Sequence, residues 1–268
     1  MLFKYIAGNN IQSALQVAHK IRESGKIPVF NYAVENIKNS LDTFKEFENM
    51  SNHIDHNDKV AIKLSSFQYD KIIVNDLIDI YKEKNIKIII DAESNEYKSV
   101  YEKTVNELIF KHNKNKCCVV KTYQMYRKDS YDILKEDIYN FRDIFHGTKL
   151  VRGAYWNSEV NQGHLYILKR DTDDNFNRGI LLLKKQNTNL FNILATHNNR
   201  SIDLGFSYNK INTSFEFGHL LGMNEKKYEE LLIHKQNVNV YIPYGPYHLM
   251  IPYLVRRLYE NSDILKYI

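Results

Sequence analysis

Two arginines near the C-terminus have the spacing of an anion-binding site. The segment YLVRRLYEN places four polar residues at i, i+3, i+4 and i+7, on one face of a helix: Tyr253, Arg256, Arg257 and Glu260. The planar guanidinium group binds a carboxylate through two parallel hydrogen bonds. An exposed Arg256–Glu260 ion pair would show the same spacing and contribute only about 0.3–0.5 kcal/mol. The segment therefore indicates either a carboxylate clamp or a solvated helix face.

A second group of polar residues stands where short apolar runs end. In a parallel α/β barrel the carboxyl ends of the strands carry the reactive groups. Several of these residues could instead cap the following helices. A lysine is a poor N-cap, however, so capping does not account for Lys63 or Lys121. The strand-end residues are Asn31, Lys63, Asp91, Lys121, Tyr123, Lys149, Arg152, Thr196, His197, Glu216 and Tyr241.

The elements that must position these residues alternate regularly. Apolar, β-branched runs predict strands at 27–32, 60–64, 88–91, 118–122, 149–154, 193–196, 213–217 and 240–242. Amphipathic stretches predict helices at 10–24, 69–84, 94–112, 129–145, 172–186, 202–209, 225–235 and 249–260. Eight such units favour an α/β fold of the (β/α)8 TIM-barrel type over a doubly wound sheet, and no G-x-G-x-x-G motif follows the first strand. We expect residues 1–268 to form a single barrel domain.

Composition excludes several classes of function. The net charge is +5, but the lysines and arginines are spread along the chain, so we expect no nucleic-acid partner. Peripheral association with an anionic membrane surface stays open. Cys117 and Cys118 are adjacent, which suits neither a disulfide nor a metal site. No signal peptide, transit peptide or membrane-spanning run is evident, so we expect an intracellular protein that is soluble or peripherally membrane-associated.

Several segments together resemble the proline dehydrogenase family. They are KLVRGAYWNSE, LATHN, FEFGHLLGM and VYIPYGPYHLMIPYLVRRLYEN, with VAIKLSS, IIIDAE and KTYQMYRKDSYDIL in matching order. LVRGAYW and YLVRR are specific to that family, and the K-L-V-R and TYQ forms are closer to its eukaryotic-type, monofunctional members. The resemblance implies a distorted (β/α)8 barrel with the last helix packed over the barrel mouth.

The resemblance also implies a reaction. Members of this family use FAD to oxidise L-proline to Δ1-pyrroline-5-carboxylate, the first step of proline catabolism, by hydride transfer to flavin N5. The electrons then pass to a quinone or another acceptor. Hydride transfer requires the ring carbon of the substrate to be held near the flavin while its carboxylate is fixed elsewhere. Cations near the flavin stabilise the negative charge that accumulates on reduction.

Roles for individual residues follow from the same resemblance. The implied catalytic residues are Asp91, Lys149 and Arg152. The implied substrate-binding residues are Lys63, Leu220, Tyr241, Tyr253, Arg256, Arg257 and Glu260. The implied flavin-binding residues are Ala92, Lys121, Val151, Gly153, Ala154, Tyr155, Trp156, Thr196, His197 and Asn198; no metal ligand is expected. The chain departs from the bacterial pattern at Lys121, where glutamine is usual, so the hydrogen bond from this position to the flavin is in question.

Other functions remain alternatives. Oxidation of 4-hydroxyproline would use the same carboxylate clamp, although Tyr241 resembles a tyrosine that crowds the 4-position in proline-preferring members. A Schiff-base aldolase built on Lys63 or Lys121 is compatible with lysines at strand ends. A third alternative is a non-catalytic barrel that has lost its reaction. His197 also has a structural alternative, as a histidine satisfied near a helix start.

Overall fold

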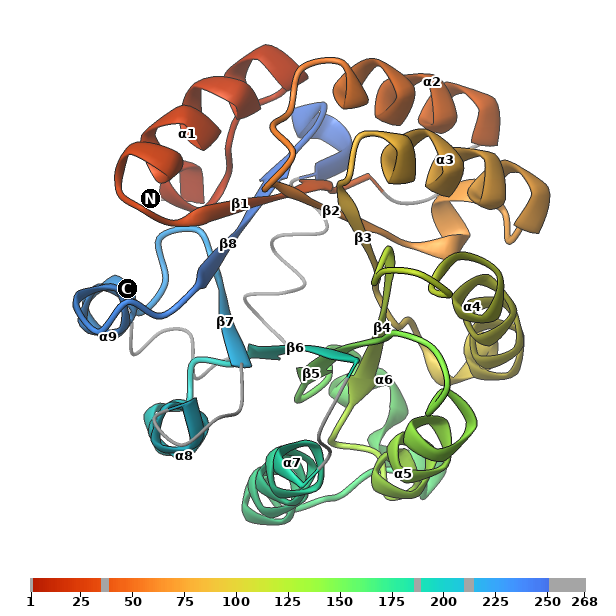
Figure 1. The fold of residues 1–268 in the computed structure, drawn as a ribbon, viewed down its shortest axis with the longest axis vertical. Coiled ribbons are helices and arrows are strands. Elements are labelled where there is room, and N and C mark those ends of the chain that lie inside the picture. The colour runs from red at the N-terminus through yellow and green to blue at the C-terminus, as the bar shows by residue number, and fades with distance from the viewer. Residues whose placement is uncertain (1, 35–38, 186–188, 210–214, 251–268) are drawn as a thin grey trace. The chain divides into compact units, whose positions relative to one another are not determined.

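The computed structural model describes residues 2–34, 39–185, 189–209 and 215–250. Within these residues, eight parallel strands follow one another in order around a closed barrel (Figure 1). They are β1 (Ile27–Tyr32), β2 (Lys59–Ile62), β3 (Lys87–Ile90), β4 (Val119–Gln124), β5 (His146–Val151), β6 (Leu190–Ala195), β7 (Phe215–Leu220) and β8 (Val238–Tyr244). The predicted (β/α)8 fold is confirmed, and each predicted strand is present near its expected position.

One α-helix precedes β1, and the other α-helices lie in the connections between the strands. They are α1 (Ile11–Glu23), α2 (Ser40–Ser51), α3 (Lys71–Glu83), α4 (Lys98–His112), α5 (Ser130–Asn140), α6 (Trp156–Glu159), α7 (Lys169–Lys184), α8 (Asn199–Asn209) and α9 (Glu225–Ile233). Sequence reasoning missed α2, although its buried residues Thr43, Phe47 and Met50 recur at helical spacing. The predicted last helix lies almost entirely outside the described residues.

Burial and local capping explain these elements. Every residue of β4 and of β8 is buried, as expected for parallel strands covered on both faces. Asp70 caps α3, because its side chain accepts hydrogen bonds from the backbone N–H groups of Ile72 and Ile73 at 2.9 and 3.3 Å. In the described part of the chain, none of the helices has the length and apolar character needed to cross a bilayer.

The described residues fall into two compact units. The first unit holds the residues up to Asp91 and those from His219 onward, and the second unit holds those of Ala92–Gly218. In the first unit, β1 pairs with β2 and β8, and β2 pairs with β3. In the second unit, β5 pairs with β4 and β6, and β6 pairs with β7. The single-domain organisation stays a prediction.

Candidate functional site

In the second unit, the side chain of Arg152 connects the ends of β5 and β6. Arg152 Nε donates to Asp173 Oδ1 on α7 at 2.6 Å, and Nη1 donates to Thr196 Oγ1 just after β6. Nη2 donates to Ser201 Oγ on α8 at 3.0 Å, and the guanidinium lies 4.6 Å from the ring centroid of Phe176. The fold therefore brings the predicted site residues Arg152 and Thr196 into direct contact.

Asn198 belongs to the same cluster. Its backbone N–H donates to Thr196 Oγ1 at 3.1 Å, and its side-chain Nδ2 donates to Asp173 Oδ2 at 3.4 Å. Its Oδ1 accepts from the backbone N–H of Ser201 at 3.2 Å, as an N-cap does at the start of a helix. Asn198 thus has a capping function here, and its predicted role toward a flavin stays a prediction. The flavin-binding role predicted for His197, which lies between Thr196 and Asn198, also stays a prediction.

The residue after Arg152 must be a glycine. Gly153 has φ +135°, and a Cβ atom at this position would lie 2.2 Å from Cδ1 of Tyr126. The backbone N–H of Tyr126 donates to the carbonyl of Arg152 at 2.7 Å, so Tyr126 fixes the backbone here as well. Beyond Gly153, the chain passes through the partly exposed residues Ala154 and Tyr155 into α6. Glycine at this position thus lets the ring of Tyr126 pack directly against the backbone at the strand end.

We expect Gly153→Ala to lower the free energy of unfolding by about 1–3 kcal/mol, because it combines a strained φ with overlap against Tyr126. Thermal or urea unfolding measures this loss. Gly163→Ala is the matched control, since Gly163 has φ +81° but nothing lies within 4 Å of its Cβ position. An equal loss in the two variants would show that the contact with Tyr126 does not restrict residue 153.

Lys149 and Val151 lie on the opposite face of β5 from Leu150. Leu150 packs toward Gly179 of α7, and successive side chains of a strand point to opposite faces. Lys149 and Val151 therefore face the interior of the barrel, and Lys149 is only 5% exposed. The catalytic role of Lys149 stays a prediction. Trp156, by contrast, is 37% exposed, and its Nε1–H donates to the carbonyl of Tyr166 at 3.2 Å.

Lys121 lies in the middle of β4, and its side chain is turned toward α4 and α5. Its ammonium is fully buried and contacts Asp137 Oδ2 at 2.5 Å, Asn106 Oδ1 at 2.7 Å and the carboxylate of Glu102. The structure does not bring Lys121 together with Arg152 and its partners. The flavin-binding role of Lys121 stays a prediction, whereas its contacts with these helices are a structural role that the sequence did not indicate.

The buried cluster continues through Tyr123 and His146. The Tyr123 hydroxyl donates to Asp137 Oδ2 at 2.7 Å and lies 2.9 Å from His146 Nε2. Burial lowers the pKa of His146 to about 3. The charge of Asp137 opposes this shift, whereas the charge of Lys121 adds to it. Burial also raises the pKa of Tyr123 well above its ordinary value. At neutral pH, Tyr123 is therefore a phenol and His146 an uncharged donor.

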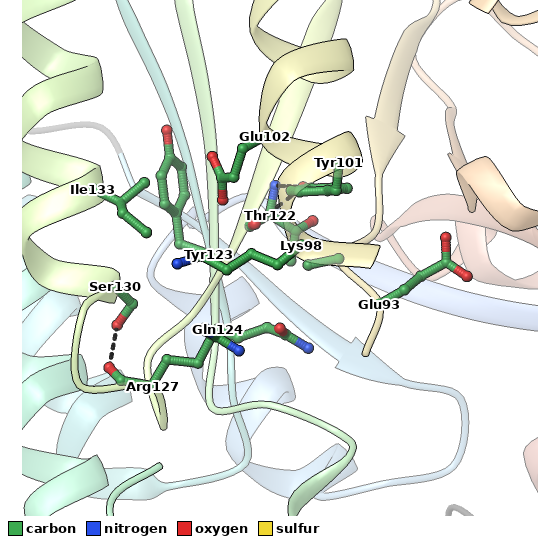
Figure 2. A pocket seen from close by; sticks show the side chains of 11 residues that line it. Glu93, Lys98, Tyr101, Glu102, Thr122, Tyr123, Gln124, Arg127, Ser130 and Ile133 are labelled. Carbon is green, nitrogen blue, oxygen red and sulfur yellow. Dashed lines mark hydrogen bonds between the residues drawn. The ribbon is translucent and has the colours of Figure 1, made fainter. Parts of the chain in front are cut away.

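A small pocket lies beside the end of β4 (Figure 2). Its lining includes the predicted flavin residue Ala92 together with Lys98, Thr122, Gln124 and Arg127. The space for water-sized groups is about 20 Å³, close to the ~10–15 Å³ that one water molecule requires. A flavin or a proline does not fit in this pocket.

In the first unit, Lys63 and Asp91 directly follow the paired ends of the neighbouring strands β2 and β3. Ile62 and Ile90 are register partners at the ends of β2 and β3, and Lys63 and Asp91 are the next residues. The backbone N–H of Asp91 also donates to the carbonyl of Ile62 at 2.8 Å. Adjacent placement of these two predicted residues therefore follows from the pairing of β2 with β3.

Leu220 and Tyr241 are also neighbours in this unit. The backbone N–H of Leu221, directly after β7, donates to the carbonyl of Tyr241 in β8 at 3.0 Å. Tyr241 is buried, with 4% of its surface exposed. The remaining substrate residues predicted from the sequence lie outside the described residues: Tyr253, Arg256, Arg257 and Glu260. The carboxylate clamp stays a prediction.

The sequence analysis did not include Glu159, a buried carboxylate after β5 that accepts several hydrogen bonds. It is 2% exposed and contacts the phenol of Tyr126 and the imidazole of His164. It closes the segment KLVRGAYWNSE, so a signal was present in the sequence. Asp173 and Ser201 were also left out of the predicted site, although they bind the guanidinium of Arg152.

The strand order places this protein among the (β/α)8 barrels, and polar residues gather at the ends of β5 and β6. A family model described as proline dehydrogenase matches residues 7–267. The chain therefore belongs to the proline dehydrogenase family.

Individual relatives agree with this assignment. The chain is 32% identical over 204 residues to "Proline dehydrogenase 2, mitochondrial" of Arabidopsis thaliana. This match covers 69% of this chain and 43% of that protein. It is 28% identical over 207 residues to "Proline dehydrogenase 1, mitochondrial" of Dictyostelium discoideum, covering 68% and 36%. "Hydroxyproline dehydrogenase" of Xenopus laevis is 30% identical over 204 residues, covering 68% and 43%. The chain thus spans less than half the length of these three relatives.

A solved structure shows the same fold. Proline utilization A from Bdellovibrio bacteriovorus, crystallised after inactivation by N-propargylglycine, superposes with a TM-score of 0.85 at 22% identity. The similarity covers 97% of this chain and 32% of that protein.

Proposed function

We propose that this protein oxidises L-proline to Δ1-pyrroline-5-carboxylate with FAD as the resident cofactor. The observation that carries the proposal is the family match over residues 7–267, within which the family-specific segment LVRGAYW supplies Arg152, whose guanidinium binds Asp173, Thr196 and Ser201. The names of the relatives from Arabidopsis and Dictyostelium support the choice of proline.

The second unit has features that fit a flavin. Lys149 and Arg152 provide cations at the end of β5, and Gly153 adds no side chain of its own there. FAD, when bound, supplies the hydride acceptor. We assign its binding to Arg152, to the segment 153–156 and to Thr196, whose hydroxyl is oriented by Arg152. In this assignment Arg152 and Lys149 favour the negative charge that builds up near the cofactor on reduction.

We assign the substrate to residues of the first unit and of the C-terminal segment. Lys63 and Asp91 follow paired strands, and Leu220 and Tyr241 supply apolar and aromatic surface. The family resemblance implies that Arg256 and Arg257 bind the carboxylate, that Tyr253 packs on the ring and that Glu260 orients Arg256. Fixing the carboxylate restricts the orientation of the ring, which is the main requirement for hydride transfer.

The first test is an anaerobic absorbance spectrum of the purified protein, reconstituted with FAD and recorded before and after addition of L-proline. We expect a flavin band that L-proline bleaches. Pyrrolidine, which lacks the carboxylate, is the matched control and should bleach the band far more slowly. Equal bleaching rates with both compounds would contradict the predicted carboxylate clamp. A protein that binds no FAD would overturn the proposed function.

4-Hydroxyproline is the second candidate substrate, because the hydroxyproline dehydrogenase of Xenopus laevis is 30% identical to this chain. The same experiment with trans-4-hydroxy-L-proline separates the two. We expect slower bleaching than with proline, since the buried Tyr241 resembles the tyrosine that crowds the 4-position. The electron acceptor we propose is a quinone, reached by peripheral association with a membrane surface; this rests on the family resemblance alone.

A further inference from the structure

Glu159 is a buried carboxylate to which the proposed function gives no role. Its Oε1 accepts a hydrogen bond from the backbone N–H of Asn95 at 2.7 Å. Its Oε2 accepts from the Tyr126 hydroxyl at 3.3 Å and lies 3.0 Å from His164 Nε2, with Arg127 Nη1 at 3.9 Å. Both oxygens are therefore occupied, as expected for a charged group with 2% exposure.

The partners of Glu159 belong to different connections of the second unit. Asn95 begins the short 3₁₀ helix that precedes α4. Tyr126 and Arg127 follow β4, whereas Glu159 and His164 follow β5. One carboxylate thus joins segments before α4, after β4 and after β5, so its removal would free several connections at once.

Tyr126 links Glu159 to the segment assigned to the flavin. The ring of Tyr126 fills the space beside Gly153, and its backbone N–H binds the carbonyl of Arg152. Burial, and after it the charge of Glu159, raises the pKa of Tyr126, so its hydroxyl stays protonated and donates to the carboxylate. The hydrogen bond to Glu159 therefore fixes the ring against which residues 152–153 lie.

We propose that Glu159 is a positioning residue that holds Tyr126 against Gly153 and so sets the position of the flavin-binding segment 152–156. This inference rests on the proposed function, because it assigns that segment to FAD. Glu159 acts through Tyr126 and is not a catalytic residue.

The test is FAD titration of the apoprotein, followed by flavin fluorescence, together with the visible circular dichroism of the bound flavin. We compare the wild-type protein with Glu159→Gln, Tyr126→Phe and the double variant. Glu136→Gln is the matched control, because Glu136 is an exposed glutamate on α5. We expect each single variant to raise the Kd for FAD at least tenfold and to change the dichroism, and the double variant to add little.

The outcomes separate the inference from the function on which it rests. Wild-type protein that binds no FAD overturns both. Wild-type protein that binds FAD, together with variants of unchanged Kd and dichroism, overturns only the role of Glu159. A lowered Tm with unchanged flavin properties means that Glu159 is merely structural, which also overturns the inference. Tyr126→Phe removes a single hydroxyl and keeps the ring beside Gly153, so it serves as the test if Glu159→Gln does not fold.

Discussion

Arg152→Met is expected to lower kcat/KM for L-proline by about 10²–10³, the range typical for removal of one preorganised electrostatic group. The guanidinium makes hydrogen bonds to Asp173, Thr196 and Ser201, and methionine replaces none of them. The substitution also removes the positive charge that, in our proposal, stabilises the reduced flavin. Steady-state kinetics of the FAD-loaded variant measures the effect.

Two further variants make this result specific. Arg178→Met is the control, because Arg178 also stacks on an aromatic ring, that of Tyr131, but is exposed on α7. Arg152→Lys keeps the charge, but a single ammonium does not reproduce the planar fork, so we expect intermediate activity. Full activity in Arg152→Met would exclude Arg152 from the catalytic residues.

Lys121→Met is expected to lower the free energy of unfolding by about 3–5 kcal/mol, the usual cost of removing one partner from a buried ion pair. Asp137, whose side chain is 4% exposed, would keep only the neutral donors Tyr123 and Asn106. We expect the Kd for FAD of the folded variant to stay unchanged. Urea unfolding and FAD titration measure the two quantities.

A control and a compensating variant test the cause of this loss. Lys103→Met removes an exposed lysine of α4 and should leave stability within about 0.5 kcal/mol. Lys121→Met combined with Asp137→Leu should recover part of the loss, because apolar groups can replace a buried ion pair. If Lys121→Met weakened FAD binding without loss of stability, the flavin role predicted from the sequence would hold and the structural role would be wrong.

The prediction of the strands succeeded because parallel strands buried on both faces are short, nearly continuous apolar runs. The same property hid the direction of their side chains. β4 reads VVKTYQ and is buried at every residue, so it shows no alternation between an inner and an outer face. Lys121 was therefore predicted at the barrel rim, whereas its side chain contacts α4 and α5.

The sequence by itself determined the fold class, the strand positions and the family, because these depend on local periodicity and on motifs within short segments. Only the tertiary structure decided which polar residues meet. Arg152 binds residues 21, 44 and 49 positions away, and Glu159 joins connections that leave different strands. Such contacts depend on strand register and on the face from which each side chain leaves its strand, and neither quantity is encoded in local spacing.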